Sequence, residues 1–233
     1  MMMPLDEKRD YVKRFFRDTG ETYDTIVRLG TCGIDGVWKR RMLQELGEPR
    51  RILDLACGTG ILTLAIARRF PDADVVGVDI TAGYLDVARR KAARLGLTRV
   101  RFEHGWAEDV AADRPFDAIT SSYLAKYADL PRLVPRLLPL LAPRGRMLFH
   151  DFSYPHHRVL AAMWERYMVL LRIVLGRRYP EWNEVLIELP DLIRRTTWVA
   201  DAAAALTAAG LEVQTEVLML QGATLVHARR PES

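Results

Sequence analysis

The sequence is poor in cysteine and has no long stretch of purely apolar residues. Its two cysteines, Cys32 and Cys57, are too few for a disulfide framework and lack the spacing of metal ligands, so we expect no bound metal. No run of about 18 uncharged apolar residues occurs, which argues against a membrane-spanning helix. The N-terminal segment MMMPLDEKRD is charged where a secretory signal would be apolar. These absences predict a cytoplasmic protein.

The chain also lacks the pattern of a nucleic-acid-binding protein, although its net charge is +4 and its pI is about 9.2. No basic stripe interleaved with aromatic residues is visible, so we expect no tight binding of RNA or DNA. Internal repeats and low-complexity tracts are missing too. A chain of 233 residues is long enough to bury a sizeable core within one large domain.

Short apolar runs alternate with helical patterns over the middle of the chain. We expect strands at 51–56, 75–78, 100–102, 116–120 and 146–152, and helices at 61–70, 82–95 and 129–141. This alternation indicates βαβ units, and therefore an α/β fold with a doubly wound, mostly parallel sheet that helices cover on both faces.

The flanking segments differ from this pattern. Helices are expected at 5–18 and 36–46 before the sheet, and at 200–209 after it, where Gly210 ends the helix. Strands at 212–220 and 224–229 follow around Gln221-Gly222, and such a close pair is antiparallel because a parallel return would need a crossover helix.

A glycine-containing turn follows the first strand. Asp54-x-x-Cys57-Gly58-Thr59-Gly60 lies at the edge of a doubly wound sheet where ligands bind, and glycines there let backbone N–H groups approach a ligand. Asp79 ends the second strand nineteen residues after Gly60, where an acidic side chain hydrogen-bonds a ribose diol. The two features together predict a nucleoside cofactor.

The same stretch indicates which cofactor this is. Thr63 stands where the dinucleotide fingerprint requires a third Gly or Ala, and no Gly-Lys-Ser/Thr follows the turn. A ribose site without a phosphate-binding pattern suits S-adenosylmethionine, because its sulfonium tail carries an amino acid and no phosphate.

The stretch Ile52–Gly60, ILDLACGTG, resembles the class I methyltransferases that use S-adenosylmethionine. Three further stretches resemble the ubiquinone/menaquinone-biosynthesis C-methyltransferases within that class: Phe16 through Tyr23-Asp24 with Gly33 and Trp38-Lys39-Arg40; Asp151-Phe152-Ser153-x-Pro155; and Ala209-Gly210-Leu211 with Gln221-Gly222-Ala223 to His227. The resemblance covers nearly the whole chain. It implies a seven-stranded sheet of order 3-2-1-4-5-7-6 with the seventh strand antiparallel.

These patterns together assign the cofactor site. The expected cofactor-binding residues are Tyr23, Asp54, Ala56, Gly58, Thr59, Gly60, Asp79, Ile80, Trp106, Ala107, Ser121 and Ser122. Trp106-Ala107 stands where the family commonly has an Asp-Ala pair for the adenine, and the tryptophan could stack on the base instead. Ser121 and Ser122 end the fourth strand and could face the reactive methyl group.

Some departures from the family pattern leave the acceptor open. Val27 stands where the family usually has Asn, and Tyr123-Leu-Ala-Lys126 replaces Gly-Leu-Arg-Asn in a stretch that is one residue shorter. The family's arginine therefore corresponds to Ala125 or to Lys126, depending on where the gap is placed.

Candidate catalytic residues cluster after the fifth strand. His150, Asp151 and Tyr154 are the predicted catalytic residues, with Asp151 the first choice for a base because it occupies the matching place at the ligand-binding edge. The alternative for Asp151 is a structural carboxylate that accepts hydrogen bonds from loop N–H groups. His156 and His157 are more simply explained as solvated residues at a helix start.

The insertion at 153–196 contains the most apolar segment of the chain. Val159 to Leu175 is interrupted only by Glu165, Arg166 and Arg172. The segment is either an ordinary core helix or a lid that admits a lipid-like substrate. His157-Arg158 and Arg177-Arg178 at its ends would suit contact with an anionic membrane surface.

We therefore expect a methyltransferase that acts on a small or lipidic aromatic acceptor, most simply at a ring carbon of a polyprenyl quinol. The alternatives are an N-methyltransferase of phospholipid amines or another amphipathic metabolite, and a cofactor-binding module without turnover. A single domain is expected, with a helical cap at 1–46, a cofactor-binding core at 47–152, a helical lid at 153–196 and a C-terminal helix and hairpin at 197–233. The oligomeric state is not predicted.

Overall fold

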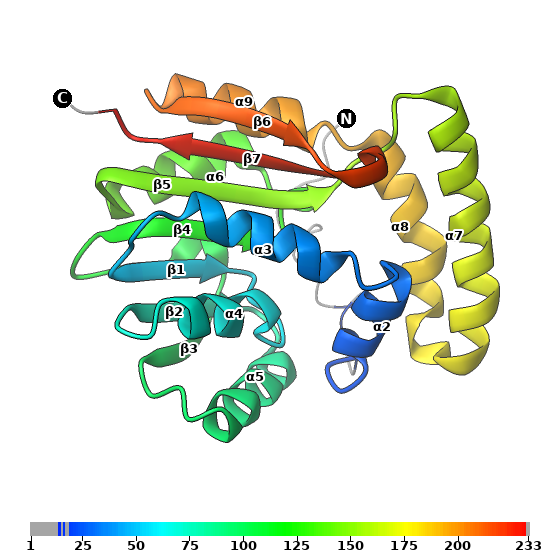
Figure 1. The fold of residues 1–233 in the computed structure, drawn as a ribbon, viewed down its shortest axis with the longest axis horizontal. Coiled ribbons are helices and arrows are strands. Elements are labelled where there is room, and N and C mark those ends of the chain that lie inside the picture. The colour runs from blue at the N-terminus through cyan, green and yellow to red at the C-terminus, as the bar shows by residue number, and fades with distance from the viewer. Residues whose placement is uncertain (1–13, 15, 17–18, 232–233) are drawn as a thin grey trace.

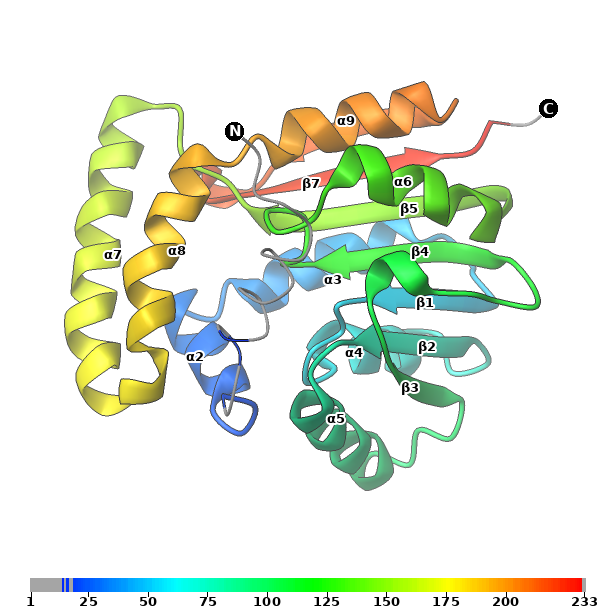
Figure 2. The same cartoon turned by 180° about the vertical axis from the view of Figure 1, so that it is seen from behind.

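The computed structural model describes residues 14, 16 and 19–231, and it has a seven-stranded sheet at its centre (Figures 1 and 2). The strand order is β3-β2-β1-β4-β5-β7-β6. β7 runs antiparallel to both β5 and β6, and the other neighbouring pairs are parallel. The strands are β1 Arg51–Leu55, β2 Asp74–Asp79, β3 Val100–His104, β4 Phe116–Ser122, β5 Leu141–Phe152, β6 Glu212–Val217 and β7 Ala223–Arg229.

Helices cover both faces of this sheet because the central strands are apolar on both sides. Leu53, Met147 and Val226 point to one face, where they pack with α6 Leu130–Leu137 and α9 Trp198–Ala208. Their neighbours in sequence, Ile52, Leu148 and Leu225, point to the other face. There they pack with α3 Asp35–Glu45 and α4 Ile61–Arg69. Successive side chains of a strand alternate between faces, so one set of strands supports both cores.

A third, smaller core lies beyond the carboxyl ends of the parallel strands. It joins α2 Tyr23–Gly30 to α7 Arg158–Arg178 and α8 Asn183–Arg195, which lie side by side at one end of the molecule (Figures 1 and 2). Ile26, Leu175, Trp182 and Val185 form its buried centre. Gly176 permits the close approach of the two long helices, because a Cβ there would collide with the side chain of Asn183. We call these three helices the α2–α7–α8 unit.

The expected fold class, strand order and antiparallel hairpin are confirmed. α5 Ala82–Arg94 and α9 lie close to their expected bounds, and the expected helix at 36–46 corresponds to α3. The helix expected at 5–18 falls mostly outside the described residues. No helix was expected at α2, whose Thr22 N-cap makes no side-chain capping bond and whose eight residues give little periodicity.

Three element bounds differ from expectation. The helix expected at 129–141 ends as α6 at Leu137, followed by a 3₁₀ turn at Leu138–Leu140. β5 begins early, at Leu141, with an irregular register opposite Phe116 and Ala118. β6 ends at Val217 because a 3₁₀ turn at Met219–Gln221 closes the hairpin, with positive φ at Leu220 and Gln221. This turn leaves Leu220 59% exposed.

Candidate active site

The parallel strands β1, β2, β4 and β5 end at one edge of the sheet, which faces the α2–α7–α8 unit (Figure 1). A cavity of about 100 Å³ opens at this edge. It is lined by residues that follow strands β1 to β4, and by Phe16, Tyr23 and Tyr84. We call it the cofactor cavity, because eight of the twelve predicted cofactor residues line it: Tyr23, Ala56, Gly58, Asp79, Ile80, Trp106, Ala107 and Ser122.

The turn after β1 has the backbone shape that its glycines predict. Gly58 and Gly60 have φ of +56° and +81°, in the left-handed region that favours glycine. Gly60 is also tightly packed, since a Cβ there would lie 3.2 Å from that of Ala88. Gly60 and Thr59 do not line the cavity; Thr59 instead bonds through its hydroxyl to Asp24 at 2.5 Å. These two residues shape the turn.

Asp79 connects this turn to the end of β2. One carboxylate oxygen accepts a hydrogen bond from the N–H of Gly58 at 2.8 Å, and the other accepts one from the N–H of Thr81 at 2.8 Å. The side chain is 7% exposed, and this burial raises the pKa of Asp79. Each oxygen keeps a second lone pair, so the carboxylate can still accept from a ribose diol at the cavity wall.

Asp54 lines a small hollow next to the cofactor cavity. The walls of this hollow also include Lys39, Tyr23, Ser122 and Tyr123. The carboxylate of Asp54 accepts hydrogen bonds from the hydroxyls of Thr63 at 2.6 Å and Thr120 at 2.8 Å. Burial raises the pKa of Asp54 to about 6. A buried carboxylate beside a buried lysine is a donor set suited to an amino-acid group, which carries one charge of each sign.

Several lining residues were not predicted from the sequence. Tyr84, Thr81, Gly105, Glu108, Leu124, Tyr127 and Ala128 line the cofactor cavity, and Phe16 was part of the resemblance without an assigned role. Tyr84 is the most enclosed of them, with its hydroxyl 2.5 Å from that of Thr19 and its ring 5.1 Å from that of Tyr23. The signal for Tyr84 was weak: it stands in the first turn after Asp79, but an aromatic residue there equally suits a helix core.

A second cavity of about 100 Å³ adjoins the first, sharing Phe16, Tyr23, Tyr123 and Tyr127 with it. Its other walls come from α2, α7 and α8 and are almost wholly apolar, including Leu171, Leu175 and Trp182. Among the described residues that line it, Lys126 is the only charged one. We call it the acceptor cavity.

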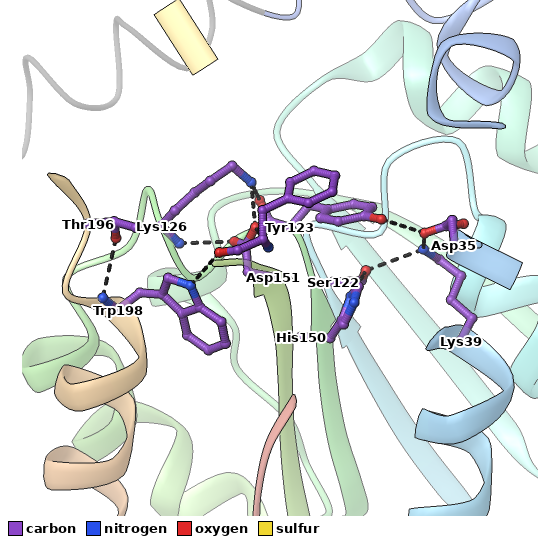
Figure 3. A network of polar contacts seen from close by, with 10 residues as sticks. Asp35, Lys39, Ser122, Tyr123, Lys126, His150, Asp151, Thr196 and Trp198 are labelled. Carbon is purple, nitrogen blue, oxygen red and sulfur yellow. Dashed lines mark hydrogen bonds and ion pairs between the residues drawn. The ribbon is translucent and has the colours of Figure 1, made fainter. Parts of the chain in front are cut away.

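Lys126 and Asp151 form a buried ion pair beside these cavities (Figure 3). The lysine Nζ lies 2.8 Å from Oδ1 of Asp151, and the two side chains are 3% and 0% exposed. Asp151 also accepts hydrogen bonds from the backbone N–H groups of Lys126 at 3.0 Å and Phe152 at 2.7 Å. Burial lowers the pKa of Lys126, and the adjacent Asp151 opposes that shift.

This geometry differs from what we expected of a base. Asp151 lines neither cavity, and both of its oxygens already accept bonds from Lys126 or from loop N–H groups. This arrangement agrees with the other expectation for Asp151, a structural carboxylate that accepts hydrogen bonds from loop N–H groups. In that role it holds the loop after β4 in place. Of the two residues that could correspond to the family's arginine, Lys126 supplies the cation of this pair, and Ala125 is a buried core residue.

A second polar network extends from α3 to β4 and β5 (Figure 3). Asp35 pairs with Lys39 and accepts a hydrogen bond from the hydroxyl of Tyr123 at 2.6 Å. Lys39 lies 3.4 Å from the hydroxyl of Ser122, which lies 2.9 Å from Nδ1 of His150. The network joins Ser122 and Tyr123, which line the cofactor cavity, to residues buried behind them.

The two other predicted catalytic residues also lie outside both cavities. His150 is 0% exposed, and burial, with the nearby Lys39 and Lys126, holds its pKa well below the usual range. Tyr154 lies beside α7, where its hydroxyl donates to Glu165 at 3.2 Å. Ser121 is buried behind the cavity edge, and its hydroxyl has no partner among the described residues.

The described residues fit S-adenosylmethionine at this edge. Asp79 is placed for a ribose, Trp106 for a base, and Asp54 with Lys39 for an amino-acid tail. Among the residues that the structure describes, no group of three His, Cys, Asp or Glu side chains is arranged to hold a metal ion. None of the helices among the described residues combines the length and the apolar composition of a membrane span.

Similarity to known proteins agrees with this fit. The profile of the family described as "Methyltransferase domain" matches residues 52–145. The demethylmenaquinone methyltransferase of Thermus thermophilus is 33% identical over 220 residues, covering 93% of this chain and 100% of the relative. A ubiquinone/menaquinone biosynthesis C-methyltransferase of Geobacter sulfurreducens is 29% identical over 198 residues, covering 82% of this chain and 77% of the relative.

Solved structures show the same fold at lower identity. An O-methyltransferase family protein of Burkholderia thailandensis superposes with a TM-score of 0.66 at 20% identity, and covers 94% of this chain and 62% of its own. The geranyl diphosphate C-methyltransferase of Streptomyces coelicolor, in complex with S-adenosyl-L-homocysteine, has a TM-score of 0.61 at 15% identity, covering 84% and 79%.

The binding-module alternative is therefore set aside, and the cofactor is S-adenosylmethionine. The chain belongs to the ubiquinone/menaquinone-biosynthesis C-methyltransferase family and is an S-adenosylmethionine-dependent enzyme of class I.

Proposed function

We propose that this enzyme methylates a ring carbon of a lipidic aromatic quinol, of the kind named for its demethylmenaquinone relatives. The observation that carries the proposal is the acceptor cavity. It adjoins the cofactor cavity, it is apolar and aromatic, and the one charged residue among the described residues of its wall, Lys126, is a cation. An aromatic ring with an ionisable hydroxyl suits such walls.

The ammonium group of Lys126 discriminates between the two acceptor classes. Its Nζ donates to Asp151 and to the carbonyl of Tyr123, and the third N–H can donate to a phenol oxygen, which favours the phenolate, a better carbon nucleophile than the neutral ring. The ammonium head group of a phospholipid amine carries only donors and cannot accept that bond. The acceptor cavity therefore favours the quinol over the N-methylation alternative.

Bound S-adenosylmethionine supplies an electrophilic methyl group, and the residues around it hold the acceptor in line with that group. Phe16, Tyr23, Tyr123 and Tyr127 line both cavities and are placed to orient the ring at their junction. Asp151 is proposed as the positioning residue for Lys126, and His150 for Ser122. Tyr154 holds α7 through Glu165.

Contact with a membrane surface is part of this proposal, because a polyprenyl quinol resides in the bilayer. We place the enzyme in the cytoplasm, where it would meet the quinol at the inner membrane surface. The division into a cap, a cofactor core, a lid and a C-terminal hairpin remains our proposal for how the chain is organised.

The experiment is a direct assay of product. The protein is incubated with S-adenosylmethionine and either a reduced demethylmenaquinol or phosphatidylethanolamine, and the products are examined by mass spectrometry and NMR. We expect the quinol to gain one CH₂ in mass, with a methyl resonance typical of a ring carbon. Methylation of the phospholipid alone, or a methyl ether on the quinol, would contradict the proposal.

A further inference from the structure

The outer side of α7 carries a row of exposed apolar side chains. Val159, Met163, Leu170, Ile173 and Val174 are between 46% and 61% exposed. At 100° per residue their spacing places them on one side of the helix. The opposite side carries Trp164 and Leu175, which are buried. We call the five exposed residues the outer stripe, and its existence makes α7 apolar on two opposite sides.

The outer stripe continues onto the turn between β6 and β7. Met219 and Leu220 are 50% and 59% exposed, and together with Met163 they line a third cavity, of about 350 Å³. Single exposed apolar residues are common on proteins, but a contiguous group marks a contact surface. This cavity is as large as a small-molecule site. It shares Met168 and Phe152 with the acceptor cavity, so the apolar surface leads inward toward the site.

The charges of α7 indicate what covers the outer stripe. The helix contains five arginines, all exposed: Arg158, Arg166, Arg172, Arg177 and Arg178. Within the described part of the chain none of the five forms an ion pair. The helix has one acidic residue, Glu165, which already pairs with Arg194. Arg166 and Arg177 fall within the stripe itself, where their long side chains can extend past apolar neighbours to phosphate groups.

A second copy of this chain fits that pattern less well than an anionic lipid surface. Two copies packed together through their outer stripes would bring the arginines of both helices close to one another. Each α7 has only one acidic residue, Glu165, to offset this positive charge. An amphipathic helix with apolar residues beside arginines is suited to the headgroup region of a bilayer. With 21 residues, α7 is about 31 Å long, and it lies along the outside of the molecule (Figure 2).

We propose that α7 docks the enzyme on an anionic membrane, with the outer stripe in the acyl boundary and the arginines at phosphate level. In this pose the cavity lined by Met163, Met219 and Leu220 opens toward the bilayer. Delivery of a lipidic acceptor through this opening rests on the proposed function, whereas docking through α7 is argued from the outer stripe and its arginines alone and holds whatever the acceptor is.

The test measures binding to vesicles, with neither cofactor nor acceptor present. The full chain is sedimented with vesicles of phosphatidylcholine, and with vesicles of two parts phosphatidylcholine to one part phosphatidylglycerol. We expect binding to the anionic vesicles, weakened by salt. The double variant Leu170→Glu/Ile173→Glu should lower the partition constant by at least about tenfold, because it removes two apolar contacts and adds two negative charges. Leu170 and Ile173 line none of the three cavities.

Leu95→Glu is the control, since Leu95 is 50% exposed at the end of α5, belongs to a different helix from the outer stripe and lines none of the three cavities. It should bind as the wild type does. Arg166→Gln/Arg177→Gln should weaken binding to anionic vesicles while leaving the fold intact by circular dichroism.

Three results would overturn the proposal. They are absence of vesicle binding, equal binding by the wild type and the double glutamate variant, and a wild-type dimer that the double variant dissociates. The last result would make the outer stripe a subunit interface. Vesicle binding without quinol methylation would instead leave docking standing and contradict the proposed function.

Discussion

The carboxyl edge of the sheet and the α2–α7–α8 unit bury different kinds of side chains. The edge holds Asp54, Asp79 and the pair Lys126–Asp151, all within 8% exposure and all fixed at or next to strand ends. The unit buries Ile26, Leu175, Trp182 and Val185 instead. Buried charges cost free energy unless rigid neighbours satisfy them, and strand ends supply such neighbours. From this difference we infer that polar groups at the strand ends bind the cofactor, whereas the apolar helices enclose the acceptor.

The largest effect should come from breaking the buried ion pair. Lys126→Met leaves the carboxylate of Asp151 buried without its cation, which should lower the free energy of unfolding by about 3–5 kcal/mol. Denaturant unfolding measures this. The double variant Lys126→Met/Asp151→Asn should recover much of the loss.

Arg89→Met is the matched control, because the Arg89–Asp86 pair is 49% and 61% exposed. It should change stability by about 1 kcal/mol or less. Equal effects at the two sites would mean that the edge does not depend on its buried charges.

The next largest effect concerns Asp79 and the cofactor. Asp79→Ala removes two charge-assisted hydrogen bonds to the ribose, so affinity for S-adenosylmethionine should fall by at least about a hundredfold in calorimetry. Asp79→Asn should also weaken binding, because both carboxylate oxygens accept backbone N–H groups and an amide can present only one acceptor. Asp86→Ala, on the exposed side of α5, is the control. Wild-type affinity in a folded Asp79→Ala protein would contradict the assignment.

A smaller effect is expected from the titration of Asp54. Its pKa of about 6 lies above the ordinary value, so the ionised form becomes populated as pH rises through 6. An ammonium group beside it favours that form. Cofactor affinity should therefore increase by about tenfold between pH 5 and pH 7. Asp54→Asn should flatten this profile, whereas a flat wild-type profile would remove Asp54 from the binding site.

The same titration affects stability with the opposite sign. A raised pKa in the folded state means that the protonated form is favoured by folding. The stabilisation that Asp54 contributes is thus fully present below its unfolded pKa and is lost as pH rises through about 6.

In the α2–α7–α8 unit, Met163→Asp should raise the KM for a long-tailed quinol several-fold, because Met163 lines the third cavity and each buried methylene contributes about 0.8 kcal/mol. A short-tailed quinol should be affected far less, and cofactor affinity hardly at all. Met163 is 56% exposed, so the variant should fold. Equal loss for both quinols would make the segment an ordinary structural helix.

The same difference between the two regions explains why the sequence predicts the cofactor site but not the walls of the acceptor cavity. Gly58, Gly60 and Asp79 lie within one βαβ unit, so their spacing predicts both the turn and the ribose site. The walls of the acceptor cavity come from Tyr23, Lys126 and Leu171, which are far apart in sequence and meet only through packing. No local pattern encodes that meeting.

The predicted catalytic residues show the same limit. Asp151 lies near the end of β5, where the sequence predicts it, but its partner, Lys126, lies in a stretch where the position of the gap is ambiguous. Without the partner, a carboxylate that accepts loop N–H groups resembles a base. The Asp35–Lys39 pair was missed because helix-surface ion pairs at this spacing are common, and only burial distinguishes this one.

The dependence of kcat/KM on the length of the acceptor's isoprenoid tail tests the division between the two regions most directly. The wild-type enzyme is assayed with a series of demethylmenaquinols that differ only in the tail, at saturating S-adenosylmethionine. We predict that kcat/KM rises as the first isoprene units are added, because they bury apolar surface in the α2–α7–α8 unit, while cofactor affinity stays constant. A kcat/KM that is independent of tail length would contradict this prediction.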